Sequence, residues 1–174
     1  MILGIDIDDT LTDSHIEIIK AWEDYYRLYD LGSYTKVLPD NINTGWDDPY
    51  IRQFWDLYRT EIAANAKAKE GAAEALYKLK RNGHVIKIVT ARPEDQRLVT
   101  LRSLKSQRLL FDELILKARY KGITCKEHGI ELQVDDTQMN LDDVSKYGIK
   151  TLRFKKEDSW NNVYKNIMHI ARHK

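Results

Sequence analysis

The chain contains one cysteine, Cys125, and three prolines in 174 residues. A single cysteine excludes an internal disulfide framework and a zinc site built from several cysteines of this chain. We expect Cys125 to be packed, in a reducing compartment. No apolar run is long enough to cross a bilayer, and no N-terminal stretch has the pattern of a secretory signal peptide. We therefore expect a cytoplasmic protein with no membrane partner.

A strong charge of either sign is also absent. The formal net charge is +1 at pH 7, so no general attraction to a nucleic acid polymer is expected. Hydrophobic residues make up 43% and charged residues 32%, which is ordinary for a globular chain of a length that can bury a core. We expect one domain carrying an insertion, and the sequence leaves a homodimer open.

Outside residues 13–68, short apolar runs alternate with helical patterns, which favours a parallel sheet of βαβ units. Strands are predicted from Met1 and at 84–89, 111–116, 130–134 and 149–154. Helices are predicted at 71–81, from Pro93, at 122–128, 140–147 and 160–170. Residues 13–68 are instead rich in aromatic side chains at helical spacing, with an irregular connection between two predicted helices.

The first predicted strand ends in three closely spaced carboxylates, Asp6, Asp8 and Asp9. Buried like charges repel one another, so such a cluster calls for a cation or a reaction. Side chains alternate along a strand, and we therefore expect Asp6 and Asp8 to point the same way. Taken alone, the stretch is better explained as a solvated acidic turn, because turns rich in aspartate are common.

Two further predicted strands end in polar groups, Thr90 and the pair Asp135-Asp136. Ligands of parallel α/β sheets bind beyond the carboxyl ends of the strands, so these groups are expected to converge with Asp6. So many carboxylates at one edge of the sheet require a hard divalent cation, and Mg²⁺ prefers oxygen ligands. Lys121, at the start of a predicted helix, is suited to bind phosphate. Taken singly, Thr90 is explained as a helix cap and Lys121 as a surface lysine.

These residue types favour phosphoryl transfer. Asp6 is suited to attack phosphorus as a nucleophile, and Asp8 to protonate the leaving oxygen and then deprotonate water. Lys121, Thr90 and backbone N–H groups are suited to neutralise the transferring phosphoryl group.

The same residues resemble the four motifs of the haloacid dehalogenase-like phosphohydrolases. Asp6-Ile-Asp8-Asp9-Thr10 is similar to the Asp-x-Asp-x-Thr motif, and Thr90, Lys121 and Asp135-Asp136 follow in the family's order. The resemblance implies an α/β fold with a Rossmann-like parallel sheet and helices on both faces, formed by residues 1–12 and 69–174. It also implies a small helical C1-type cap, residues 13–68, inserted after the first strand.

The resemblance further implies a Mg²⁺ cofactor, held by Asp6, the Asp8 carbonyl, Asp135 and, through water, Asp136. It implies phosphate binding by Thr90, Ala91 and Lys121.

The overall layout resembles the small 5'(3')-deoxyribonucleotidase-like group. That likeness implies a Mg²⁺-dependent phosphomonoesterase acting on a (deoxy)nucleoside monophosphate through an aspartyl-phosphate intermediate. The better-known members carry Thr-Ser-Pro where this chain has Thr90-Ala91-Arg92-Pro93, so we predict Arg92 as an extra substrate contact. Trp46, in the irregular connection, is predicted to contact substrate as well. The alternatives are a phosphatase of a sugar phosphate or other small phosphomonoester, and a non-catalytic module that binds a phosphate ligand.

Overall fold

The acidic turn follows the central strand of a five-stranded parallel sheet. The computed structural model describes residues 1–30, 37–43, 45 and 47–173. The strand order is β3-β2-β1-β4-β5. The strands are β1 (Ile2–Ile5), β2 (Val85–Val89), β3 (Glu113–Ile115), β4 (Leu132–Asp135) and β5 (Lys150–Arg153). β1 pairs with β2 on one side, with Ile2 opposite Val85, and with β4 on the other, with Leu3 opposite Leu132. The predicted α/β fold is therefore confirmed.

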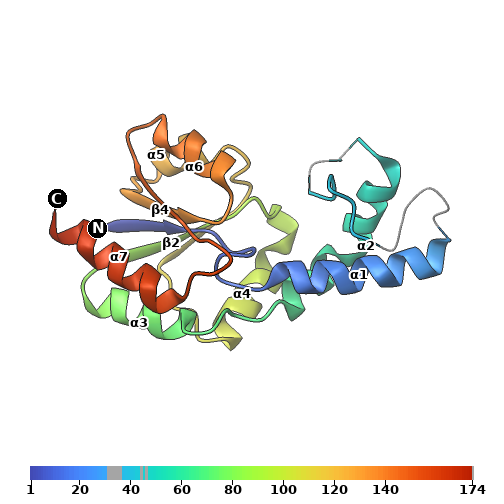
Figure 1. The fold of residues 1–174 in the computed structure, drawn as a ribbon, viewed down its shortest axis with the longest axis horizontal. Coiled ribbons are helices and arrows are strands. Elements are labelled where there is room, and N and C mark those ends of the chain that lie inside the picture. Colours follow the sequence, from blue (N-terminus) through green and yellow to red (C-terminus); the bar gives the residue numbers. More distant parts are fainter. Residues whose placement is uncertain (31–36, 44, 46, 174) are drawn as a thin grey trace.

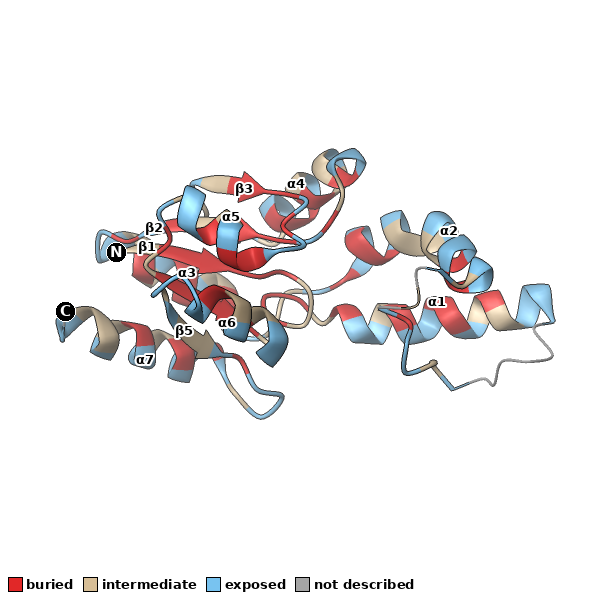
Figure 2. Ribbon diagram, turned by 90° about the horizontal axis from the view of Figure 1, so that it is seen from above, coloured by how far each residue is buried: buried red, intermediate tan, exposed pale blue. Residues whose placement is uncertain are grey.

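Helices cover both faces of the sheet (Figure 1). One face carries α3 (Ala72–Arg81), α4 (Arg97–Ser106) and α7 (Trp160–Arg172), and the other carries α5 (Lys121–Glu127) and α6 (Gln138–Ser145). A short 3-10 helix, η1 (Glu94–Gln96), precedes α4. Figure 2 shows that burial concentrates in the strands and on the helix faces turned toward them.

The main core lies on the α3, α4 and α7 face. Its largest side chain, Trp160, is fully buried, and its indole Nε1 donates a hydrogen bond to the carbonyl of Thr10 at 3.0 Å. The opposite face contains Cys125, which is buried as expected and contacts the Gln133 Oε1 atom at 3.4 Å. Burial raises the pKa of the Cys125 thiol to about 12, which is typical of a packed rather than a reactive cysteine.

A helical insertion separates β1 from α3 and β2. It contains α1 (Ser14–Tyr29) and α2 (Pro49–Asn65), which extend away from the sheet (Figure 1). The two helices share an apolar core of their own, in which Trp22, Tyr25 and Phe54 are fully buried. Asp48 caps α2 by accepting a hydrogen bond from the Tyr50 backbone N–H at 2.8 Å.

Ile16, Ile19 and Trp22 recur at helical spacing in α1, but only Trp22 of these three is buried. Ile16 and Ile19 are exposed, at 51% and 37%, whereas Ile18 and Ala21 are buried together with Trp22. The aromatic side chains decide which face packs against α2, because they bury the largest apolar area.

The two connections between the insertion and the sheet run side by side. The Asp13 N–H donates to the Lys67 carbonyl and the Lys69 N–H to the Leu11 carbonyl, each at 2.8 Å. An ion pair between Lys69 and Asp13 joins the same two segments. The insertion therefore enters and leaves the rest of the chain at one place.

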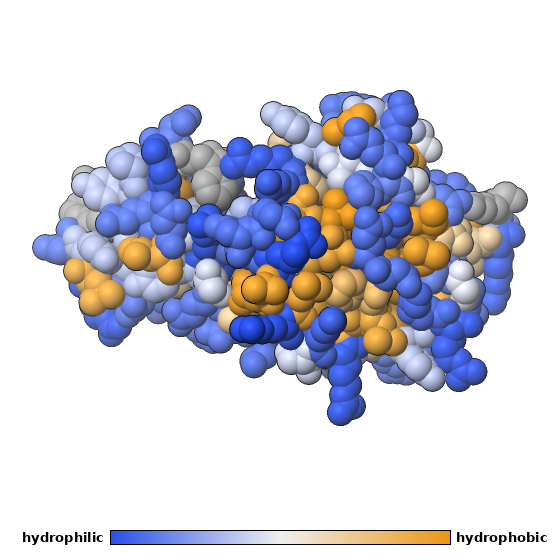
Figure 3. Space-filling model, turned by 180° about the vertical axis from the view of Figure 1, so that it is seen from behind, coloured by the Kyte–Doolittle hydropathy of each residue, from blue (hydrophilic) through white to orange (hydrophobic). Residues whose placement is uncertain are grey.

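Among the described residues, no helix combines the length and the apolar character needed to cross a bilayer. Viewed from behind, the molecule shows apolar side chains gathered over its middle between hydrophilic ones (Figure 3). Single exposed apolar side chains, such as Leu98 of α4 at 67%, are normal on a protein surface.

Candidate active site

Two carboxylates from neighbouring strands meet one lysine at the carboxyl edge of the sheet. Asp6 follows β1 directly, Asp135 is the last residue of β4, and Lys121 is the first residue of α5. The Lys121 Nζ atom lies 2.6 Å from Asp6 Oδ1 and 2.5 Å from Asp135 Oδ2. All three side chains are buried. The sheet thus brings together three of the residues that the sequence analysis selected.

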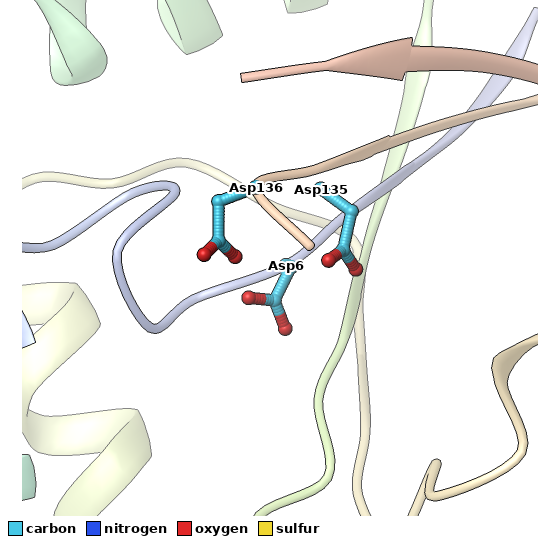
Figure 4. Close-up of side chains that lie close together, drawn as sticks. All are labelled: Asp6, Asp135 and Asp136. Carbon is cyan, nitrogen blue, oxygen red and sulfur yellow. The ribbon is translucent and has the colours of Figure 1, made fainter. Parts of the chain in front are cut away.

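Asp136 completes the acidic cluster. Carboxylate oxygens of Asp6, Asp135 and Asp136 all lie within 4.8 Å of one another. Figure 4 shows the three side chains grouped at the ends of their strands. These hard oxygen donors suit Mg²⁺.

Burial makes this cluster electrostatically costly. It raises the pKa of Asp6 from 3.8 to about 8; Lys121 opposes the shift, while Asp135 and Asp8 add to it. Burial likewise raises the pKa of Asp136 to about 6, with the Asp135 and Asp9 charges adding to the shift. Although burial acts to lower the pKa of Lys121, Asp6 and Asp135 raise it and keep the ammonium charged. The raised pKa values mean that the cluster resists full ionisation, and a divalent cation bound there would favour the ionised carboxylates.

Several side chains that the sequence analysis did not select hold the cluster in place. Asn140 Nδ2 and the Thr137 N–H both donate to Asp135 Oδ1 at 3.0 Å. The Asp136 N–H donates to Thr10 Oγ1 at 3.1 Å, which ties the end of β4 to the turn after β1. Asn140 lies in the first turn of α6, just after the acidic pair, and its position near a strand end was the only sequence clue to its role.

Asp8 lies apart from the acidic cluster and is bound by Arg92. The Arg92 Nε atom donates to Asp8 Oδ2 at 3.0 Å, and Nη2 donates to Oδ1 at 2.6 Å. The Ser14 hydroxyl donates to the same Oδ1 at 2.5 Å. Burial acts to raise the pKa of Asp8, but the Arg92 and Ser14 contacts outweigh it and lower that pKa.

The sequence predicts that Asp6 and Asp8 point the same way, but their side chains contact different partners. β1 ends at Ile5, so strand alternation does not extend to Asp8. Beyond the strand the chain turns, because the N–H groups of residues 10–12 all donate to the Ile7 carbonyl and Asp9 has a φ of 59°. Asp6 therefore contacts Lys121 while Asp8 contacts Arg92.

The remaining candidates lie around the end of β2. Thr90 is buried, and its Oγ1 accepts a hydrogen bond from the Arg92 N–H at 3.2 Å. Ala91, the next residue, is exposed. Trp46 lies outside the described residues, and its predicted substrate contact stays a prediction.

No family model matches the sequence, and no curated protein matches it either. The fold, however, is similar to many solved structures. One is described as a predicted phosphatase from Clostridium acetobutylicum, with a TM-score of 0.71, 17% identity, and coverage of 97% of this chain and 98% of that chain.

A second similar structure is a haloacid dehalogenase-like hydrolase from Streptococcus pneumoniae, with a TM-score of 0.68, 15% identity, and coverage of 99% and 98% of the two chains. A third is described as a predicted phosphoglycolate phosphatase from Haemophilus somnus, with a TM-score of 0.66, 15% identity, and coverage of 98% and 97%. At these identities the likeness concerns the fold, a parallel sheet with a helical insertion.

Proposed function

We propose that this protein is a Mg²⁺-dependent phosphomonoesterase of the haloacid dehalogenase type, acting on a small phosphorylated metabolite. The observation that carries the proposal is the position of the Lys121 Nζ atom, within 2.6 Å of both Asp6 and Asp135. A buried nucleophile, a fixed ammonium and two further carboxylates at one sheet edge suit phosphoryl transfer better than a structural role.

In the first half-reaction, the Asp6 carboxylate attacks phosphorus and forms an acyl phosphate. The bond between phosphorus and the leaving oxygen breaks, and that oxygen takes its proton from Asp8. Because Arg92 and Ser14 lower the pKa of Asp8, this carboxylate first takes up the proton from the phosphate monoanion of the bound substrate. Lys121 offsets negative charge on the transferring group, and the Thr90 hydroxyl donates a hydrogen bond to one of its oxygens.

In the second half-reaction, Asp8 takes a proton from water, whose oxygen attacks the acyl phosphate. The bond between phosphorus and the Asp6 oxygen breaks, and inorganic phosphate leaves. Mg²⁺, when bound by Asp6, Asp135, the Asp8 carbonyl and, through water, Asp136, would supply positive charge to the phosphoryl oxygens. Asn140 holds the Asp135 carboxylate, and Thr10 holds Asp136 through its backbone N–H.

The helical insertion acts as a cap over this site. Residues 13–68 form the cap, and residues 1–12 and 69–174 form the catalytic core. The separate apolar core around Trp22 and Phe54 supports that division, as do the paired connections. A cap closing over a phosphate site excludes water during transfer.

The first substrate class to test is a (deoxy)nucleoside monophosphate, because the overall layout of the chain resembles that of the small deoxyribonucleotidases. Trp22 and Tyr25 are buried in the insertion and unavailable for stacking on a base, and Trp46 stays the residue that we propose for it. The alternative is a sugar phosphate or another small phosphomonoester. The similar structure described as a predicted phosphoglycolate phosphatase favours keeping that alternative.

Phosphate release from a panel of nucleotides, sugar phosphates and phosphoglycolate tests the proposal, with Mg²⁺ and with a chelator. We expect turnover in Mg²⁺ and at least about 100-fold less with the chelator, because the phosphoryl oxygens then lose the charge of the cation and Asp6 keeps its raised pKa. Turnover of nucleotides alone supports the finer proposal, and turnover of other phosphomonoesters alone replaces it. Ligand binding without any turnover indicates the non-catalytic alternative.

Mg²⁺ is also expected to stabilise the protein. A ligand that binds only the folded state adds about 2.7 kcal/mol at 100 times its dissociation constant. Thermal melting with and without Mg²⁺ measures this. The Asp135→Asn variant is expected to lose most of the Mg²⁺ effect, whereas Asp142→Asn, an exposed carboxylate of α6, keeps it. Equal Mg²⁺ effects in both variants would place the cation elsewhere.

A further inference from the structure

Both oxygens of the Asp8 carboxylate are held by the protein itself. Arg92 binds them with two nitrogen atoms, Nε to Oδ2 and Nη2 to Oδ1, at 3.0 and 2.6 Å. Such two-point contacts fix the plane of a carboxylate as well as its position. Ser14, the first residue of α1, adds a third donor at 2.5 Å.

Arg92 is in turn anchored from the core. Its Nη1 atom donates to the Thr100 Oγ1 atom of α4 at 3.2 Å, and Thr100 is fully buried. Its backbone N–H donates to Thr90 Oγ1 at 3.2 Å, and its carbonyl accepts from the Lys117 N–H at 2.9 Å. Arg92 is therefore held in place both at its backbone and at the guanidinium end of its side chain.

The side chains of Arg92 and Asp8 differ in their exposure to solvent. The Arg92 side chain is only 8% exposed, whereas the Asp8 side chain is 39% exposed. All three guanidinium nitrogens have acceptors within the protein. Arg92 is thus poorly placed to contact a substrate, while the carboxylate that it holds stays accessible.

We propose that Arg92 is the positioning residue of this site: it acts through Asp8, by orienting the carboxylate that exchanges protons with the leaving oxygen and with water. This assignment differs from the substrate contact that the sequence suggested, and it rests on the proposed phosphatase function. Proton transfer depends steeply on geometry, and a displacement of about 1 Å can lower a rate roughly 100-fold. A lysine keeps the charge at this position but cannot make the two-point contact.

A double-mutant cycle between Arg92 and Asp8 tests the proposal. The variants are Arg92→Lys, Asp8→Asn and the double variant, with kcat and KM measured in Mg²⁺. We expect Arg92→Lys to lower kcat by about 10- to 100-fold, with KM changed less than about threefold. In the Asp8→Asn background the same substitution is expected to have almost no further effect, because the carboxylate that it orients is gone.

The leaving group supplies a second readout. The leaving group of an aryl phosphate such as p-nitrophenyl phosphate needs little proton donation. Arg92→Lys is therefore expected to lower the rate of aryl phosphate hydrolysis less than the rate of alkyl phosphate hydrolysis. Thr100→Val, which removes only the anchor of Nη1, is the milder variant and is expected to lower kcat in the same direction by a smaller factor. Circular dichroism melting of each variant establishes that it is folded.

The outcomes separate the two proposals. Wild-type protein without metal-dependent turnover overturns the phosphatase function and the positioning role with it. Wild-type turnover with a raised KM and unchanged kcat in Arg92→Lys overturns the positioning role alone, and shows a substrate contact instead. An equal loss of kcat in both backgrounds, or for both leaving groups, also overturns it.

Discussion

Replacing Asp6 by asparagine is expected to lower kcat by at least about 1000-fold, because the amide cannot attack phosphorus to form the acyl phosphate. Asparagine has nearly the same shape, and its Oδ1 can still accept the hydrogen bond from Lys121. The substitution also removes one of three carboxylates that lie close together. The metal-free variant is therefore expected to be at least as stable as the wild type. Phosphate release and thermal melting measure the two effects.

Asp9→Asn is the matched control, since it makes the same change in the same turn. Asp9 Oδ1 accepts a hydrogen bond from the His15 N–H at 2.9 Å, which an asparagine oxygen can keep. Asparagine also tolerates the positive φ of this residue. We expect the control to retain activity within about threefold. Near-wild-type turnover by Asp6→Asn in Mg²⁺ would refute the aspartyl-phosphate route.

Truncating Trp160 to alanine is expected to give the largest loss of stability. The side chain is fully buried, so its removal should lower the free energy of unfolding by about 3–5 kcal/mol. For a chain of this length, that corresponds to a melting temperature lower by roughly 10 °C. The substitution also removes the donor to the Thr10 carbonyl, so activity is expected to fall even where the variant is folded. Urea unfolding followed by circular dichroism measures the change.

Two further variants separate packing from hydrogen bonding. Trp160→Phe keeps most of the buried volume and loses the indole N–H, and is expected to cost about 1–2 kcal/mol. Trp55→Ala, at a half-buried tryptophan of the insertion, is expected to cost less than Trp160→Ala. If Trp160→Phe were as unstable as Trp160→Ala, the hydrogen bond rather than packing would dominate.

The convergence of Asp6, Lys121 and Asp135 could be predicted because it depends on topology alone. Apolar runs that alternate with helices form a parallel sheet, and groups at the carboxyl ends of adjacent strands then share one edge. The predicted helix after residue 121 begins at Lys121 itself, so the lysine lies at the edge as expected.

The contact between Asp8 and Arg92 could not be predicted in the same way. Asp8 lies in a turn, where neither the strand period nor the helix period fixes the direction of a side chain. Arg92 lies in an irregular segment between β2 and η1. The roles of Ser14 and Thr10 are missed for a related reason: each depends on hydrogen bonds that the path of the backbone decides, although Thr10 belongs to the first motif. Similarly, apolar spacing alone did not determine which face of α1 is buried.

The central place of β1 in the sheet has a consequence for how the protein folds. β1 is made first, but its partners come much later in the chain, since Ile2 pairs with Val85 and Leu3 with Leu132. Contacts between such distant segments slow folding, because long loops must close before the pairing is gained. During synthesis, β1 must therefore wait beside an incomplete sheet until β4 emerges, and the Asp6–Lys121–Asp135 cluster forms only then. β1, which Asp6 follows directly, is thus open to premature association while its partner strands are still being made.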